Sequence, residues 1–190
     1  MDALLRIAAH IDRLNRVVGR AMVWPLLGAV LVAAGNALAR KFLGVSSNFW
    51  LELQWYLFSA AFLGSAGYVL LVDEHVRVDA LARRWSPRTR ARLDVLALGF
   101  FALPLTVLFA VPGWRLFAQA WRTVEGSLNA GGPQRWVALL CIPLGMVLLG
   151  LQCLSELVRR IAFLRGHVGR PTLTEADLPP LPGQRAGAPR

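Results

Sequence analysis

The densest group of ionisable side chains in the sequence is the run Asp73-Glu74-His75-Val76-Arg77-Val78-Asp79. Carboxylates and an imidazole are ligand types that a metal ion accepts, but no second ligand cluster accompanies them. Ion pairing and helix capping explain the run better, with Asp79 able to cap a helix over 80–85. We therefore predict a structural network on the cytoplasmic side, made by Asp73, His75, Arg77 and Asp79.

A second polar group opens an apolar stretch with the residues Glu52, Gln54, Trp55 and Tyr56. On a helix, Glu52 shares one face with Trp55 and Tyr56. A carboxylate at the edge of the hydrocarbon costs free energy unless it is hydrated or paired. Two interpretations stay open: Glu52 reaches water, or it pairs with an arginine or a backbone N–H on a neighbouring helix.

The same stretch continues with small residues at a spacing of four, which lets two helices approach closely in lipid. We predict that the following residues pack against a helix or another subunit: Glu52, Gln54, Trp55, Tyr56, Ala60 and Gly64.

The elements that position these residues are apolar helices. The chain has 190 residues, of which 56% are hydrophobic and 17% charged, and its mean hydropathy is +0.49. Such a composition excludes a disordered chain, and two cysteines exclude a disulfide scaffold. Four uncharged windows are long enough to cross a bilayer: 21–39, 53–72, 95–114 and 136–155. The predicted fold is an all-α integral membrane protein with a bundle of four transmembrane helices over residues 21–160.

The first window also admits a second interpretation, as a secretory signal that ends at Ala37-Leu38-Ala39. Its apolar run is longer than that of a signal peptide, which favours a retained helix.

Arginine placement predicts the orientation. Sixteen of the 21 Lys and Arg residues lie before the first window, between the second and third, or after the fourth. The positive-inside rule then places both termini in the cytoplasm of a multi-pass inner-membrane protein. We expect Arg83, Arg84, Arg88, Arg90 and Arg92 to bind anionic phospholipid headgroups. No nucleic-acid-binding motif accompanies the net charge of +10.

Segments outside the windows are also patterned. Apolar residues at helical spacing predict a cytoplasmic amphipathic helix over 1–20 that lies in the interface with its arginines toward headgroups. A solvated extension of the first span is the alternative. Trp114, Phe117 and Trp121 predict that the third helix continues beyond its window. Residues 161–190 are predicted to form a disordered cytoplasmic tail.

Catalytic chemistry has little support in the sequence. The three histidines lie outside the windows, and no nucleotide-binding, nucleophile or metalloprotease motif is present. No window has a charge at its centre, as a proton or ion pathway usually requires. We predict neither an enzyme nor a bound cofactor or metal.

Two sequence motifs resemble a known family. Glu52-x-Gln54-x-Tyr56 opens the second window, and His75-Val76-Arg77-Val78-Asp79 follows it. Together they resemble the small membrane subunit, the DctQ-type small permease, of tripartite ATP-independent periplasmic (TRAP) transporters, over roughly residues 20–160.

The resemblance implies a role and partners. The small subunit would scaffold a large membrane subunit that holds the substrate and sodium sites. A periplasmic substrate-binding protein would transiently deliver a C4-dicarboxylate or related organic acid anion for symport. The alternative function is a self-sufficient homo-oligomeric transporter or channel, with a pore built from Glu52, Asn36 or Gln54.

Overall fold

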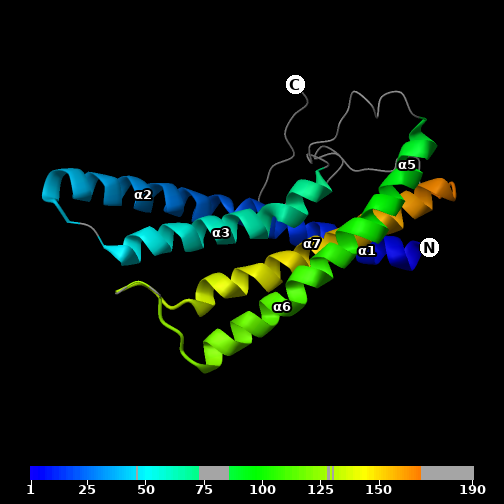
Figure 1. Cartoon of the computed structure of the whole chain (residues 1–190). Coiled ribbons are helices and arrows are strands. Elements are labelled where there is room, and N and C mark those ends of the chain that lie inside the picture. Colours follow the sequence, from blue (N-terminus) through cyan, green and yellow to red (C-terminus); the bar gives the residue numbers. More distant parts are fainter. Residues whose placement is uncertain (46, 73–85, 128, 130, 168–190) are drawn as a thin grey trace, which may run out of the picture.

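The structure is a computed structural model that describes residues 1–45, 47–72, 86–127, 129 and 131–167 (Figure 1). In these ranges all regular structure is helical. The helices are α1 (Asp2–Ala21), α2 (Val23–Leu43), α3 (Asn48–Leu71), α5 (Pro87–Leu96), the π-helix η1 (Ala97–Ala102), α6 (Leu103–Arg122) and α7 (Trp136–Leu164). Only Met22 separates α1 from α2, and α5, η1 and α6 follow one another without a break (Figure 1).

Local sequence explains where several helices begin and end. Gly44 adopts a left-handed conformation with φ of +66° after the last turn of α2, which favours glycine there. The Ser47 side chain accepts a hydrogen bond from the backbone N–H of Phe49 at 3.3 Å and so caps α3. Ser86 caps α5 in the same way through Thr89, and Pro87 occupies the first helical position, where no N–H is needed.

Three helical segments are long and apolar enough to cross a membrane: Ala3–Leu43, Pro87–Arg122 and Trp136–Leu164. They contain the first, third and fourth predicted windows. The second window lies in α3 except for its last residue, and α3 has 24 residues. Glutamate, glutamine and aromatic residues in its first two turns lower its hydropathy, so its crossing of the membrane stays a prediction. The helix that contains the third window does continue past Trp114, as far as Arg122.

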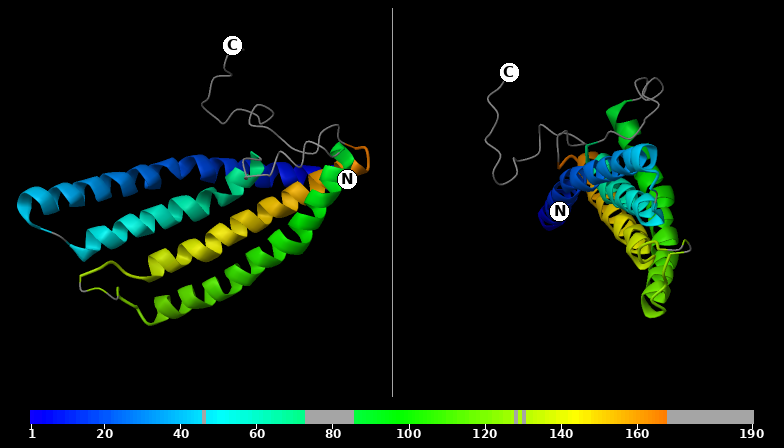
Figure 2. Two further views of the ribbon diagram at one scale, coloured as in Figure 1. Left: turned by 45° about the horizontal axis from the view of Figure 1, so that its top comes forward. Right: turned by 90° about the vertical axis from the view of Figure 1, so that its left-hand side faces the viewer.

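The helices form a single layer in the order α2, α3, α7, α6 (Figure 2). Each helix in the row packs on its immediate neighbours, and α1 packs on both α3 and α7. A bundle of four transmembrane helices was expected, and that prediction did not specify the order or the layering of the helices. A single layer is compatible with lipid, because an apolar helix face needs no cover from protein in a bilayer. The buried apolar cluster is correspondingly small and centres on Leu70, Leu98 and Cys153.

Glycines bring the helices of this layer close together. A Cβ atom at Gly145 of α7 would lie 2.6 Å from the Leu63 Cβ of α3. A Cβ at Gly113 of α6 would lie 2.9 Å from Ile142 Cγ2 of α7. Close approach of backbones increases dispersion contacts, which drive helix association in lipid.

Candidate functional site

One side of α1 faces inward, onto α3 and α7, and carries some of its polar residues. Asp12, Asn15 and Arg16 have exposed fractions of only 3%, 0% and 3%, whereas Leu4 and Ile7 are exposed. The sequence predicted a helix whose arginines point to lipid headgroups, and Arg16 does not follow that expectation. Other polar residues of α1, Arg13 among them, are exposed together with the apolar residues, so the outward side of α1 carries both kinds of side chain.

Asp12 is the centre of these contacts. Its Oδ1 accepts hydrogen bonds from Gln152 Nε2 at 3.0 Å and from Ser155 Oγ at 2.7 Å. Its Oδ2 forms an ion pair with the Arg159 guanidinium. Asn15 adds a further bond, from its Nδ2 to Gln152 Oε1 at 2.9 Å. One carboxylate of α1 therefore binds three side chains of α7.

A second ion-paired group joins α5 to α7. Arg160 is 1% exposed; its Nε donates to Asp94 Oδ2 at 3.1 Å, and its Nη1 pairs with Glu156 one turn earlier. We refer to the two groups together as the α7 polar network, defined by Asp12, Asn15, Asp94, Gln152, Ser155, Glu156, Arg159 and Arg160.

Most charges of the α7 polar network are buried, and each of its guanidinium groups pairs with at least one carboxylate. An uncompensated charge away from water costs several kcal/mol, so the network is stable only when its partners are in place. It therefore sets the position of α1 and α5 on α7 more than it adds net stability. None of its residues was predicted as a site. Their spacing was the available signal, because Gln152, Ser155, Glu156 and Arg159 recur at intervals of three or four on one helical face.

A separate polar joint lies at the other end of the layer. Glu52, at the start of α3, accepts hydrogen bonds from Ser127 Oγ and from Asn129 Nδ2, the latter at 2.6 Å. Ser127 Oγ in turn accepts the backbone N–H of Asn129 at 2.9 Å. The hydrogen bonds from Ser127 and then Asn129 lower the pKa of the Glu52 carboxyl below its ordinary value of 4.5. Within the described residues this carboxylate thus binds side chains of the loop after α6, and no hydrogen bond or ion pair joins it to an arginine or a backbone N–H.

Aromatic rings pack beside this joint. The Trp121 and Trp136 centroids lie 4.6 Å apart in an edge-to-face contact, and Phe117 lies 6.2 Å from Trp121. Arg135 approaches Glu125 at 3.6 Å across the loop. The rings fix the end of α6 against the start of α7, so that the loop between them reaches Glu52.

The remaining predicted residues are distributed as follows. On α3, Trp55 is 64% exposed, whereas Gln54, Tyr56, Ala60 and Gly64 are partly buried. Gly64 approaches Met22, because a Cβ there would lie 3.0 Å from Met22 Cγ. At the start of α5, Arg88 and Arg92 are exposed and Arg90 is partly buried. Asp73, His75, Arg77, Asp79, Arg83 and Arg84 lie outside the described residues.

The described part of the chain contains no assembled site for metal or thiol chemistry. It holds no group of three or more His, Cys, Asp or Glu residues that could bind a metal ion. Cys141 and Cys153 are free thiols, and Cys153 is buried in the apolar cluster. The arrangement binds helices to one another at both ends of the layer.

Long apolar helices with polar joints at their ends define a helical, multi-pass membrane protein. A family model for the DctQ component of tripartite ATP-independent periplasmic transporters matches residues 29–163. The chain belongs to this family and is the small permease type of subunit in a TRAP transporter. No curated protein and no solved structure matches it significantly. The family and the apolar helices agree with the inner membrane as its location.

Proposed function

We propose that this chain scaffolds the large membrane subunit of a TRAP transporter, which takes up a small organic acid anion with sodium. The observation that supports a scaffold is the single layer of helices, whose segments are joined by polar contacts at both ends. Charged side chains of α2, α3 and α7 lie toward the helix ends, so these helices offer no charged pathway through their centres. Substrate and sodium sites then belong to the large subunit.

The layer also suits a fixed part of a moving transporter. Its helices meet at glycines and are tied by buried ion pairs, and such contacts have one preferred register. The large subunit would move its transport domain against this layer. The loop from 123 to 135, held by Glu52, is the surface proposed to meet the periplasmic substrate-binding protein.

The proposed orientation follows from the two ends of the layer. The start of α1, the start of α5 and the end of α7 lie at one end, and the loops after α2 and α6 lie at the other (Figure 2). Arginines are concentrated at the first end, which we assign to the cytoplasm. Each arginine near anionic lipid there contributes about 1 kcal/mol.

Reconstitution tests this proposal. Vesicles would contain this chain alone, the large subunit alone, or both, together with the binding protein, its substrate and a sodium gradient. Uptake that requires both membrane subunits is the expected result. Uptake by this chain alone would overturn the scaffold role in favour of a homo-oligomeric transporter. Co-purification of the two subunits at about one to one from native membranes would show directly whether they form a complex.

A further inference from the structure

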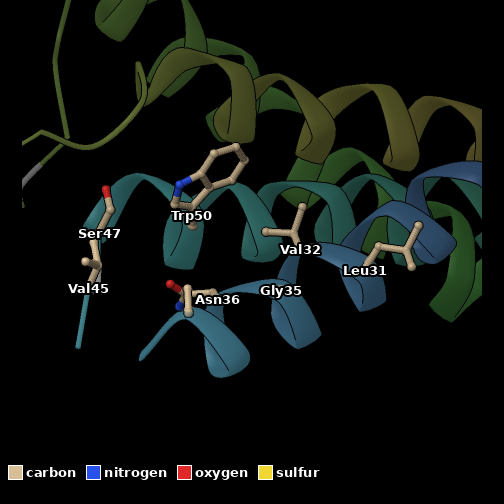
Figure 3. A pocket seen from close by; sticks show the side chains of 8 residues that line it. Leu31, Val32, Gly35, Asn36, Val45, Ser47 and Trp50 are labelled. Carbon is tan, nitrogen blue, oxygen red and sulfur yellow. The ribbon is translucent and has the colours of Figure 1, made fainter. Parts of the chain in front are cut away.

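A pocket of about 410 Å³ opens between α2 and α3, and its lining includes no residue of the Glu52 joint or of the α7 polar network (Figure 3). Its volume falls in the range of small-molecule sites. Its walls are mainly apolar and include Val32, Gly35 and Ala39 of α2 and Trp50 of α3. α2 is at the edge of the layer and packs on α3, so the pocket lies near that edge.

The two ends of this pocket differ in polarity. Leu31 and Val32 lie toward one end, and Asn36 and Ser47 lie toward the other, beside the loop after α2 (Figure 3). The Asn36 amide has no hydrogen-bond partner within the described residues, whereas the Ser47 side chain is engaged in capping α3. A ligand with an apolar tail and a polar group would fit this pocket, with its tail at the apolar end and its polar group beside Asn36.

Positive charge flanks the polar end. Arg40 lies one turn after Asn36 on the same face of α2, and side chains on a helix lean toward its N-terminus. The Arg40 side chain is exposed and has no ion pair with the described residues. Lys41 follows it and lies over the Phe42 ring at 5.6 Å. An unpaired guanidinium one helical turn beyond the polar end of an apolar pocket fits a phosphate group attached to a hydrocarbon chain.

We propose that this pocket binds one anionic phospholipid from the leaflet at this end of the protein. An acyl chain lies between α2 and α3, the ester region meets Asn36, and the phosphate pairs with Arg40. A helix of a partner protein fits less well, because the positive charge beside the pocket is confined to one end.

Native mass spectrometry of the full chain in mild detergent tests this site, with phosphatidylglycerol and phosphatidylethanolamine as probes. We expect one tightly bound phosphatidylglycerol. Arg40→Gln should weaken it about fivefold, the effect of one cation near anionic lipid. Gly35→Leu should abolish it by filling the pocket. A Cβ at Gly35 meets no atom within 4 Å, so the helix itself has room for the new side chain.

Two matched controls separate this site from general lipid adhesion. Arg122→Gln removes an exposed arginine at the end of α6, on the far side of the layer. Gly99→Leu adds the same side chain at another glycine with open space around it. Both controls should keep the bound phosphatidylglycerol.

Two results would overturn the proposal. One is equal binding of phosphatidylglycerol by the wild type, Gly35→Leu and Arg40→Gln. The other is loss of the large subunit from Gly35→Leu with lipid binding unchanged, which would assign the pocket to a partner helix. If Gly35→Leu fails to fold, Arg40→Gln and its control Arg122→Gln still decide the question.

Discussion

The carboxylate of Asp12, in the first helix, forms an ion pair with the guanidinium of Arg159, near the end of the last one. Both side chains are buried, and Ser155 and Gln152 donate hydrogen bonds to the same carboxylate. The family match begins at residue 29, after α1. The pair therefore fastens a segment outside the matched region to a helix inside it.

Breaking the pair on one side should destabilise the protein. Asp12→Asn leaves Arg159 buried without its counter-charge, which costs about 3 kcal/mol. Arg159→Gln should cost a similar amount, since Asp12 then keeps only neutral donors. The double variant should recover part of the loss, because no charge is left uncompensated. The measurement is the thermal midpoint of the purified chain in detergent.

Arg13→Gln is the control for that pair, because Arg13 is on the same helix but exposed. Its midpoint should match the wild type within experimental error. Equal destabilisation of Arg13→Gln and Asp12→Asn would mean that α1 depends on its overall charge rather than on this ion pair.

Replacement of Arg160 by lysine should lower the stability of the protein. Arg160 donates from Nε to Asp94 and from Nη1 to Glu156, and lysine has a single ammonium that lacks this fork geometry. Arg160→Lys should therefore lower stability by about 1.5 kcal/mol, the value of one charged hydrogen bond. Arg165→Lys, at an exposed position just after α7, should have no effect in the same thermal assay. An unchanged midpoint for Arg160→Lys would show that charge alone suffices at this position.

A methyl group at Gly145 should disturb the contact between α3 and α7. The new Cβ would lie 2.6 Å from Leu63 Cβ and 2.8 Å from the Leu63 carbonyl oxygen, and the backbone cannot give way cheaply. Gly145→Ala should cost about 2 kcal/mol, typical of overpacking. Gly35→Ala has open space and provides the control, which should be neutral or slightly stabilising. Equal midpoints for the two variants would argue against close packing at Leu63.

The joint at Glu52 should depend on pH. Its pKa is lowered in the folded protein, mainly by the Ser127 hydrogen bond, from an ordinary value of 4.5. The ionised Glu52 carboxylate therefore stabilises the folded state at pH values above 4.5. This stabilisation is lost as the pH falls through the pKa that Glu52 has in the folded protein. The thermal midpoint should therefore drop more steeply below pH 4.5 for the wild type than for Glu52→Gln.

Glu125→Gln controls for general acid effects on the same loop. Its ion pair with Arg135 is partly exposed, so it contributes little. Its pH profile should follow the wild type. If the thermal midpoints of the wild type, Glu52→Gln and Glu125→Gln change in parallel with pH, Glu52 is not the source of the pH dependence.

Cysteine labelling should report the proposed orientation. Cys141 and Cys153 are first replaced by serine or alanine, and then Gly126→Cys or Arg165→Cys is introduced. Gly126 lies in the loop after α6, and Arg165 follows α7 at the opposite end of the layer. A membrane-impermeant thiol reagent should label Gly126→Cys in intact cells and Arg165→Cys only after permeabilisation. The reverse pattern would invert the proposed topology.

Local sequence patterns predicted several helices of this protein and its family. Apolar length predicted the helices around 21–39, 95–114 and 136–155, because crossing a bilayer requires about 20 apolar residues in one run. The short motifs around Glu52 and His75 predicted the family, and the match over 29–163 confirms it. These features depend on residues near one another in the chain.

Only the tertiary structure decided which distant residues meet. Neither the pairing of Asp12 with Arg159 nor the contact of Glu52 with Ser127 follows from hydropathy. Each depends on the rotation and register of helices, which are set by glycine contacts and by the compensation of buried charge. The single layer has the same origin. A chain in lipid gains no further burial energy by closing its helices into a bundle, so side-chain packing determined its shape.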